Sequence, residues 1–253
     1  MSVLLKVDNV KKIFGDVRAV DGVSFEVEQG VTTAIIGANG AGKTTLFNII
    51  SKMLVPDSGK LIFEGEDITK STPQQVINKG MVKSFQISSL FEELTCFECI
   101  RMAVISLKRK GLNIFSNVNH IAEINEKVEE IIETFGLQDH AYSFTKELPH
   151  GCRKQLDVAI AFALEPKVLL LDEPTSGMSF ADKARTMELI EKLNKESDVT
   201  ISLIEHDMDV VYSLAKNLIV MHEGKILATG TPKELVDDPI VREVYFGESD
   251  ITA

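Results

Sequence analysis

The chain has 253 residues, 44% of them hydrophobic, which is enough for one large domain or for a core with a subdomain. Its formal net charge of −11 argues against a broad nucleic-acid-binding face, although residues 108–110 (Lys-Arg-Lys) form a local basic cluster. The longest apolar runs are much shorter than a membrane span, and charged residues interrupt the N-terminal segment where a signal peptide would need an apolar core. We therefore expect a cytosolic protein that reaches a membrane only through partners.

The first thirty residues predict β-strands. Residues 3–7 (Val-Leu-Leu-Lys-Val) form the first predicted strand, a turn follows at residues 14–16, and residues 23–27 alternate apolar and polar side chains. Gln29 and Gly30 then turn the chain into a short apolar strand at residues 34–36.

A glycine-rich turn follows that strand, with the spacing Gly37-x-x-x-x-Gly42-Lys43-Thr44 of a phosphate-binding P-loop. The glycines let backbone N–H groups point inward as an anion nest, and the next helix adds its positive N-terminal end. Lys43 is placed to reach the β- and γ-phosphates of a nucleotide, and Thr44 to bind Mg²⁺. The alternative, a plain glycine turn, is disfavoured by the strand before the pattern and the helix after it. The residues expected to contact the nucleotide here are Gly37, Asn39, Gly40, Ala41, Gly42, Lys43, Thr44 and Thr45.

After the P-loop, the predicted structure passes from mixed strands and helices to helices alone. The P-loop helix is expected to end near residue 53, with a turn at 56–59, a strand at 60–63 and a short helix capped at residues 71–73. Residues 88–163 favour helices, best seen at 123–135, and residues 106–120 are predicted to be a loop or insertion. We interpret 88–163 as a helical subdomain. Its Cys96-x-x-Cys99 pair lies in an apolar helical pattern with no second cysteine pair, which favours buried thiols over a metal or redox site.

Strands and helices alternate again from residue 167 onward. Strands are predicted at residues 168–171, 200–204, 218–222 and 225–229, and helices at 182–194 and 208–215. This alternation predicts a mostly parallel sheet with right-handed crossovers.

Two adjacent acids, Asp172 and Glu173, end the apolar strand at residues 168–171. Open α/β sheets bind ligands at this end of their strands, so Asp172 is placed to hold Mg²⁺ and Glu173 to polarise the water that attacks the γ-phosphate. The alternative is a strand that ends in solvated acids, which a P-loop about 120 residues earlier disfavours.

The P-loop, Gln86, the run Asp172-Glu173-Pro174-Thr175 and His206 together resemble the ATP-binding-cassette (ABC) ATPase domain in order and spacing. The resemblance covers essentially the whole chain. It implies an α/β P-loop NTPase fold: a RecA-like core with an antiparallel β subdomain (residues 1–87 and 164–253) and the helical subdomain. It also implies a head-to-tail dimer that sandwiches two ATP molecules with Mg²⁺.

The family's site residues carry over by position. Phe14 matches the aromatic that stacks on adenine, with a core aromatic as the alternative. Gln86 matches the glutamine that senses Mg²⁺ and the γ-phosphate, and His206 matches the switch histidine at the γ-phosphate. On physical grounds alone, a histidine at a strand end is more often structural.

The segment at residues 148–155 occupies the position of the family's LSGGQ signature, which closes the ATP site of the opposite subunit. Pro149 replaces the serine and so removes a hydroxyl and a backbone N–H, His150 replaces a glycine, and Gly151 is kept. We expect Gly151 and the helix N-terminus to be the remaining contacts, and His150 either adds a donor or only occupies the loop. Ser179 replaces the aspartate of the family's D-loop, so a salt bridge from that position is absent.

Several features resemble one branch of the family, the ATP-binding subunits of importers of branched-chain amino acids and of urea, amides and carboxylates. They are the Gly177-Met178 pair, the loop after Ser106 and the tail at residues 230–232 and 241–247. We therefore expect an ATPase of such an importer, at the cytoplasmic face of the inner or plasma membrane. Residues 87–101 are expected to meet the permease, with ordinary subdomain core as the alternative. The second cassette of the dimer is either a copy of this chain or a different chain.

Three other functions stay open from the sequence alone. One is a soluble ABC ATPase that acts on a scaffold complex, and another is the ATPase of a lipopolysaccharide-export-type transporter, which shares parts of the tail but lacks the inserted loop. The third, a DNA- or ribosome-associated ABC protein, is disfavoured by the acidic charge, and no nucleic-acid partner is expected.

Overall fold

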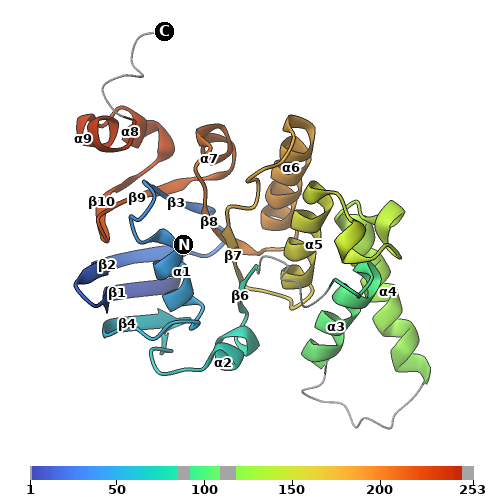
Figure 1. Cartoon of the computed structure of the whole chain (residues 1–253). Coiled ribbons are helices and arrows are strands. Elements are labelled where there is room, and N and C mark those ends of the chain that lie inside the picture. Colours follow the sequence, from blue (N-terminus) through green and yellow to red (C-terminus); the bar gives the residue numbers. More distant parts are fainter. Residues whose placement is uncertain (1, 85–91, 109–117, 247–253) are drawn as a thin grey trace.

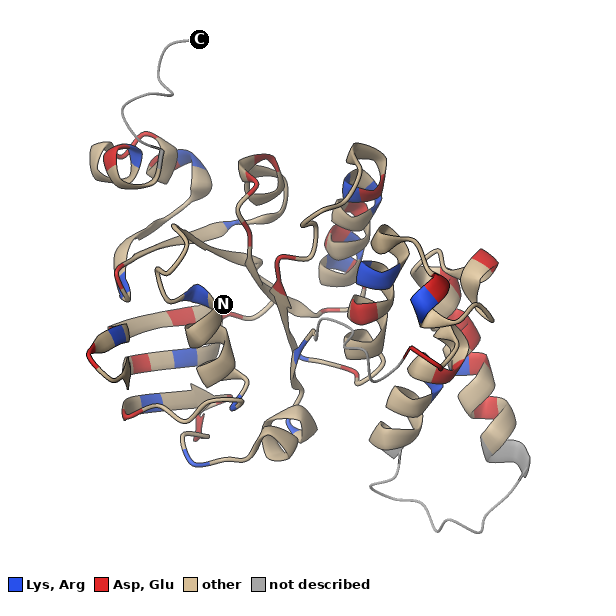
Figure 2. Cartoon of the chain, viewed as in Figure 1, with Lys and Arg blue, Asp and Glu red and all other residues tan. Residues whose placement is uncertain are grey.

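Two β-sheets and a set of helices make up the molecule, with a group of helices set to one side of the sheets (Figure 1). The computed structural model describes residues 2–84, 92–108 and 118–246. Lys and Arg are interspersed with Asp and Glu along both sheets and the helices (Figure 2). No helix in the described part of the chain combines the length and apolar composition that crossing a membrane requires.

The N-terminal strands form a four-stranded antiparallel sheet in the order β2-β1-β4-β5. The bounds are β1 (Val3–Phe14), β2 (Val17–Glu28), β4 (Ser58–Phe63) and β5 (Glu66–Asp67). The strands predicted at residues 3–7 and 23–27 are confirmed, and both run further than predicted because β1 and β2 pair along almost their full length. The sheet is the antiparallel β subdomain that the sequence predicted.

The second sheet has six strands in the order β10-β9-β3-β8-β7-β6. All neighbours pair in parallel except β10, which is antiparallel to β9. The mostly parallel sheet is thus confirmed, and the strand at residues 200–204 has the predicted bounds. The bounds are β3 (Thr33–Gly37), β6 (Met81–Lys83), β7 (Val168–Asp172), β8 (Thr200–Ile204), β9 (Asn217–His222) and β10 (Lys225–Gly230).

The parallel sheet is buried on both faces, which explains its uninterrupted apolar strands. Alternate residues of one strand belong to different cores: Ala34 and Ile36 join the core under the helical region, whereas Ile35 joins the core shared with the antiparallel sheet. Leu169 and Leu170 divide in the same way on β7. The sheet is therefore held rigidly between two apolar layers.

Helices follow the strands as the alternation predicted. Thr72 caps α2 in a reciprocal capping box with Gln75, as the sequence of residues 71–73 predicted. A π-helical turn (Arg242–Phe246) follows α9 at the end of the described residues. The helices packed around the two sheets are α1 (Lys43–Ile50), α2 (Pro73–Asn78), α6 (Phe180–Glu196), α7 (Met208–Leu214), α8 (Pro232–Val236) and α9 (Pro239–Val241).

The described residues between β6 and β7 form the helical region. Its helices are α3 (Cys96–Lys108), α4 (Val118–Thr134) and α5 (His150–Phe162), with two short 3-10 turns at Gln138–His140 and Thr145–Glu147. The loop predicted at residues 106–120 is wrong at both ends, since α3 continues to Lys108 and α4 begins at Val118. The start of α4 was missed because Asn119 and His120 follow an Asn- and Ser-containing stretch, and helical periodicity shows only from residue 124 on.

Candidate nucleotide site

The site lies at the carboxyl ends of the parallel strands. Register fixes which residues meet there: Ile35 on β3 pairs with Ile204 on β8, and Ile204 pairs with Asp172 on β7. The residues that follow these three positions therefore leave the sheet at one edge. They include the P-loop, Glu173 and His206, which the sequence predicted to work together.

The P-loop has two glycines that no other residue can replace without moving the backbone. A Cβ on Gly42 would lie 2.1 Å from the Ala19 carbonyl oxygen, and a Cβ on Gly37 would lie 2.3 Å from the Met221 carbonyl oxygen. Gly42 also has φ +97° and serves as the N-cap of α1 without a side-chain hydrogen bond. The first turn of α1 consequently presents its N–H groups uncovered by a capping side chain, as an anion site requires.

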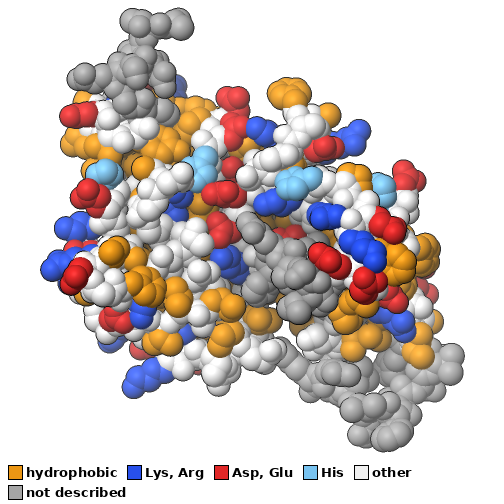
Figure 3. Space-filling view, viewed as in Figure 1, with side chains coloured by type: hydrophobic (Ala, Val, Ile, Leu, Met, Phe, Trp, Pro, Cys, Tyr) orange, Lys and Arg blue, Asp and Glu red, His pale blue; other side chains and the backbone are white. Residues whose placement is uncertain are grey.

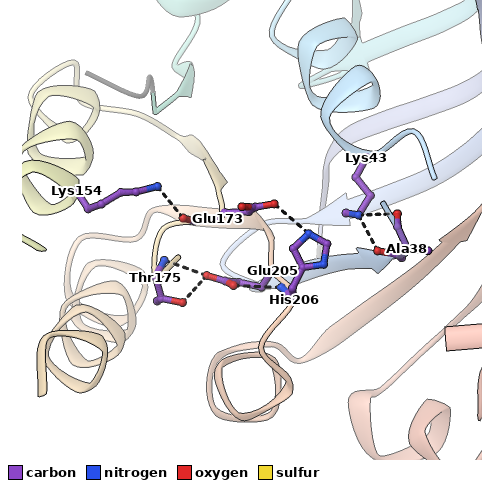
Figure 4. A network of polar contacts seen from close by, with 8 residues as sticks. Ala38, Lys43, Lys154, Glu173, Thr175, Glu205 and His206 are labelled. Atoms are coloured by element: carbon purple, nitrogen blue, oxygen red, sulfur yellow. Dashed lines mark hydrogen bonds and ion pairs between the residues drawn. The ribbon is translucent and has the colours of Figure 1, made fainter. Parts of the chain in front are cut away.

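Lys43 is buried within this loop. Its Nζ donates hydrogen bonds to the carbonyl oxygens of Gly37 (2.7 Å) and Ala38 (3.0 Å), as Figure 4 shows. Burial lowers the pKa of Lys43, and the negative charges of Glu173 and Asp172 oppose that shift. The ammonium group is therefore held inside the phosphate-binding loop and interacts electrostatically with both acids.

Asp172 has a partner that the sequence analysis did not identify. Its Oδ2 lies 3.0 Å from Nζ of Lys83, at the end of β6, and the same ammonium donates to Oδ1 of Asn48 at 2.9 Å. Both charged side chains are largely shielded from solvent. Lys83 thus holds the carboxylate in place and connects β7 to α1. The missed signal is a lysine that ends a short strand, which is common and does not by itself indicate a site.

Glu173 adopts a left-handed backbone conformation, with φ +51°. Such a conformation is unfavourable for a residue with a Cβ and persists where its surroundings hold it. Here the Glu173 N–H donates to the Ile204 carbonyl (3.0 Å), and its carbonyl accepts from Nζ of Lys154 on α5 (3.0 Å). The helical region thereby contacts the backbone of the acid expected to act on water.

His206 meets Glu173 directly. Nε2 of the histidine and Oε1 of the glutamate are 3.0 Å apart, and both side chains are about one-third exposed (Figure 4). The sequence assigned Glu173 to the attacking water and His206 to the γ-phosphate, and the direct contact between their side chains is a finding of the structure. Because both groups are accessible at the edge of the sheet, they are able to meet a water or a phosphate.

The donor set fits a nucleotide with Mg²⁺. Thr44 is exposed at the start of α1 and carries a hydroxyl, and Asp172 supplies a carboxylate, so both predicted ligands are oxygens, which Mg²⁺ prefers. Among the described residues, no group of three or more His, Cys, Asp or Glu side chains is able to hold a metal. A bound Mg²⁺ would therefore rely on phosphate and water oxygens beside these protein ligands, which is its usual mode of binding.

The signature segment opens α5. Pro149 is the N-cap and provides no side-chain hydrogen bond, His150 is exposed and Gly151 is half-buried. His150 lies against Gly177, where an added Cβ would be 3.1 Å from the ring, and Gly151 lies equally close to Asp182. Ser179, which stands where the family has aspartate, caps α6 by accepting from the Asp182 N–H.

Two expected site residues, Phe14 and Gln86, stay predictions. Phe14 is 48% exposed at the end of β1, with the ammonium of Lys12 5.5 Å from its ring centre. Its exposed ring is free to stack on a base, so the adenine contact stays a prediction. Gln86 lies outside the described residues.

The Cys96-x-x-Cys99 pair is buried in α3, as predicted. Burial raises the pKa of Cys96 to about 12 and that of Cys99 to about 11. Both thiols are therefore protonated at neutral pH, which rules out an activated thiolate at these positions.

A parallel sheet with a P-loop after β3, paired acids after β7 and a histidine after β8 defines a nucleotide-hydrolysing P-loop ATPase. Residues 20–176 match the family model described as ABC transporter, and residues 225–251 match the model of the branched-chain amino acid ATP-binding cassette transporter. The chain belongs to the ABC transporter family and is an ATP-binding cassette ATPase.

Known relatives match this chain along nearly its full length. The high-affinity branched-chain amino acid transport ATP-binding protein BraF of Pseudomonas aeruginosa is 32% identical, over 97% of this chain and 98% of its own. The probable branched-chain amino acid transport ATP-binding protein LivG of Methanocaldococcus jannaschii is 34% identical over the same shares. A solved ATP-binding cassette of an ABC transporter in its ADP conformation is 32% identical, with a TM-score of 0.84 over 98% of this chain and all of that one.

Proposed function

We propose that this chain is the ATP-hydrolysing subunit of an importer for branched-chain amino acids or related small solutes such as urea, amides and carboxylates. The observation that carries the hydrolytic part is the 3.0 Å contact between Glu173 and His206, beside the P-loop. The match of residues 225–251 and the names of the relatives support the solute class.

The side chains have distinct roles in this proposal. Lys43 and the N–H groups at the start of α1 bind the phosphates and stabilise the charge that develops on them. Thr44, Asp172 and Gln86 would hold Mg²⁺, which when bound would neutralise phosphate charge. Glu173 orients and polarises the attacking water, and His206 contacts the γ-phosphate while holding the glutamate. Catalysis is thus positioning and electrostatics.

The site is half of a composite site. The α5 N-terminus of a second cassette, either identical or different, would close it with Gly151 and His150. The exposed start of α5 supports this, because helix N-terminal N–H groups bind anions even where Pro149 has replaced a serine.

The permease would dock beside α3, which places the cassette at the cytoplasmic face of the membrane. Residues 87–91 of the predicted interface lie outside the described residues, whereas Phe97 packs partly buried against Tyr142, with ring centres 5.6 Å apart. On the face in Figure 3, hydrophobic side chains lie over α3 and α4. An apolar cavity of about 220 Å³ lies between α3 and α5, lined by Cys99, Met102, Ala103, Ser106, Ile160 and Leu164.

Met102 offers a test of this docking, since it lines the cavity and is 43% exposed. We expect Met102→Glu to lose binding to the permease, because a charge would enter an apolar interface, while the isolated chain still binds ATP. The measurement is recovery of the tagged chain with membranes that contain candidate permeases of a branched-chain amino acid importer, together with amino-acid-stimulated ATPase activity in proteoliposomes.

The matched control is Met53→Glu, the same change at a residue 53% exposed after α1 and outside the cavity. It should keep membrane binding. Equal binding by both variants would contradict docking at α3, and pull-down of soluble partners alone would contradict transport.

A further inference from the structure

We infer that Glu205 is a positioning residue for hydrolysis: its buried carboxylate ties together the two loops that carry Glu173 and His206. This rests on the catalytic roles proposed for those two residues. Glu205 directly precedes the histidine and was not singled out from the sequence, where an acid at a strand end reads as a solvated one. In the structure it is only 3% exposed.

The carboxylate accepts three hydrogen bonds (Figure 4). Oε1 accepts from the backbone N–H of Thr175 (3.1 Å) and from its hydroxyl (2.7 Å), and Oε2 accepts from the backbone N–H of His206 (3.2 Å). Thr175 is itself 2% exposed. Hydrogen bonds to a buried charged group are stronger than neutral ones, so this contact holds both backbones firmly.

The two loops come from different strands. Thr175 lies two residues beyond Glu173 in the loop from β7 to α6, and His206 lies in the loop from β8 to α7. Glu205 bridges them on the buried side. On the more exposed side, Lys183 of α6 forms an ion pair with Asp207, the N-cap residue of α7. Because the Glu173 backbone is held in a left-handed conformation, it depends on such restraints.

The charged and titratable groups near Glu205 explain why a carboxylate suits this place. The pKa of Lys183 is raised, first by its hydrogen bond with Asp207 and also by the charge of Glu205. The pKa of Tyr245 in the C-terminal turn is raised by burial and then by the charge of Glu205. A glutamine at position 205 would offer only one acceptor oxygen. Its amide NH₂ group would take the place of the second oxygen and would face a backbone N–H, which is also a donor. The three donors therefore require a carboxylate.

Glu205→Gln tests the inference with an isosteric change. We expect the kcat for ATP hydrolysis to fall by about 10- to 100-fold, because small misplacements of reacting groups slow a reaction by such factors. The dissociation constant for ATP should change by less than about twofold. The readouts are steady-state hydrolysis and equilibrium binding of a fluorescent ATP analogue. The matched control is Glu191→Gln on the exposed face of α6, where only a surface pair with Lys195 is lost and activity should persist.

A second measurement separates positioning from folding. In a His206→Ala background, Glu205→Gln should cost clearly less than in the unmutated protein, because one of the two side chains whose loops it holds is already gone and only the positioning of Glu173 is left to lose. The opposite result, a loss in both backgrounds of equal size, would overturn the inference, as would an unchanged kcat in the Glu205→Gln protein. Thr175→Val should reproduce the kcat loss and Thr175→Ser should restore most of it, because serine keeps the hydroxyl.

The outcome for the proposed function is read from a different variant. If Glu173→Gln hydrolyses ATP normally, the catalytic assignment itself fails. If Glu173→Gln is slow and Glu205→Gln is not, only the positioning role is wrong.

Discussion

The nucleotide edge of the parallel sheet and the helical region are built by different means. At the sheet edge, backbone pairing between β3, β8 and β7 sets where the P-loop, Glu173 and His206 leave the strands. In the helical region, α3, α4 and α5 are placed by side-chain packing around residues such as Ile100, Val128 and Leu156, all fully buried. The first arrangement is rigid in register, and the second depends on the packing of side chains.

This difference separates binding from coupling. The sheet edge holds what one chain needs to bind and orient a nucleotide, whereas the helical region carries the signature helix and the surface expected to meet other subunits. Lys154 joins the two by donating to the Glu173 carbonyl. A substitution confined to the helical region should therefore leave nucleotide binding intact, and one confined to the sheet edge should leave the packing of the helical region intact.

Lys43→Ala should have the largest effect on the sheet edge. We expect ATP affinity to fall by about a hundredfold or more, because the buried ammonium is the positively charged side chain that the P-loop offers to the phosphates. Equilibrium nucleotide binding measures this. Lys52→Ala is the matched control, since Lys52 is also a buried lysine with a pKa lowered by burial, but it donates to the Thr69 carbonyl. Unchanged affinity in Lys43→Ala would contradict the P-loop assignment.

Ile131→Ala should affect the helical region alone. Ile131 is 1% exposed in α4, so its truncation should lower the free energy of unfolding by about 2–5 kcal/mol through lost burial and a cavity. ATP affinity of the folded chain should stay within about twofold. Urea denaturation and nucleotide titration measure the two quantities, with Ile121→Ala, half exposed on the same helix, as the control. A large loss of affinity in Ile131→Ala would show that the regions are not separable.

The smallest effect concerns thiol reactivity. Because the pKa values of Cys96 and Cys99 are about 12 and 11, their thiolate fraction at pH 8 is at most about one part in a thousand, and raising the pH toward 11 would raise it. We expect a thiol reagent to label Cys152, which is only half-buried, before either of them. Mass spectrometry of the labelled native protein checks the order. Rapid labelling of Cys96 or Cys99 would mean that α3 opens readily.

Much of the sheet edge was predictable from the sequence. A P-loop is recognisable from glycine spacing because Gly37 and Gly42 have no room for a Cβ, and Asp172 and Glu173 stand out because an apolar strand leads into them. Each signal is local, and the fold brings strand ends to a common edge by rule.

The remaining parts required the structure. Lys83 and Glu205 come close to the site through pairings between strands that are distant in sequence, so neither side chain differs locally from an ordinary surface charge. The ends of α3 and α4 were misplaced because polar residues at their termini hide the helical period. Packing, which decides these features, is not visible in one sequence.

The hydrolysis rate of bound ATP in Glu173→Gln tests the central claim most directly. Glutamine keeps the shape of the side chain and removes its ability to accept a proton, so single-turnover hydrolysis should slow by about 10²- to 10⁴-fold. ATP should stay bound, and the chain should accumulate as a dimer with its partner cassette. Hydrolysis within about twofold of the unmutated rate would contradict the assignment of Glu173 as the residue that acts on water.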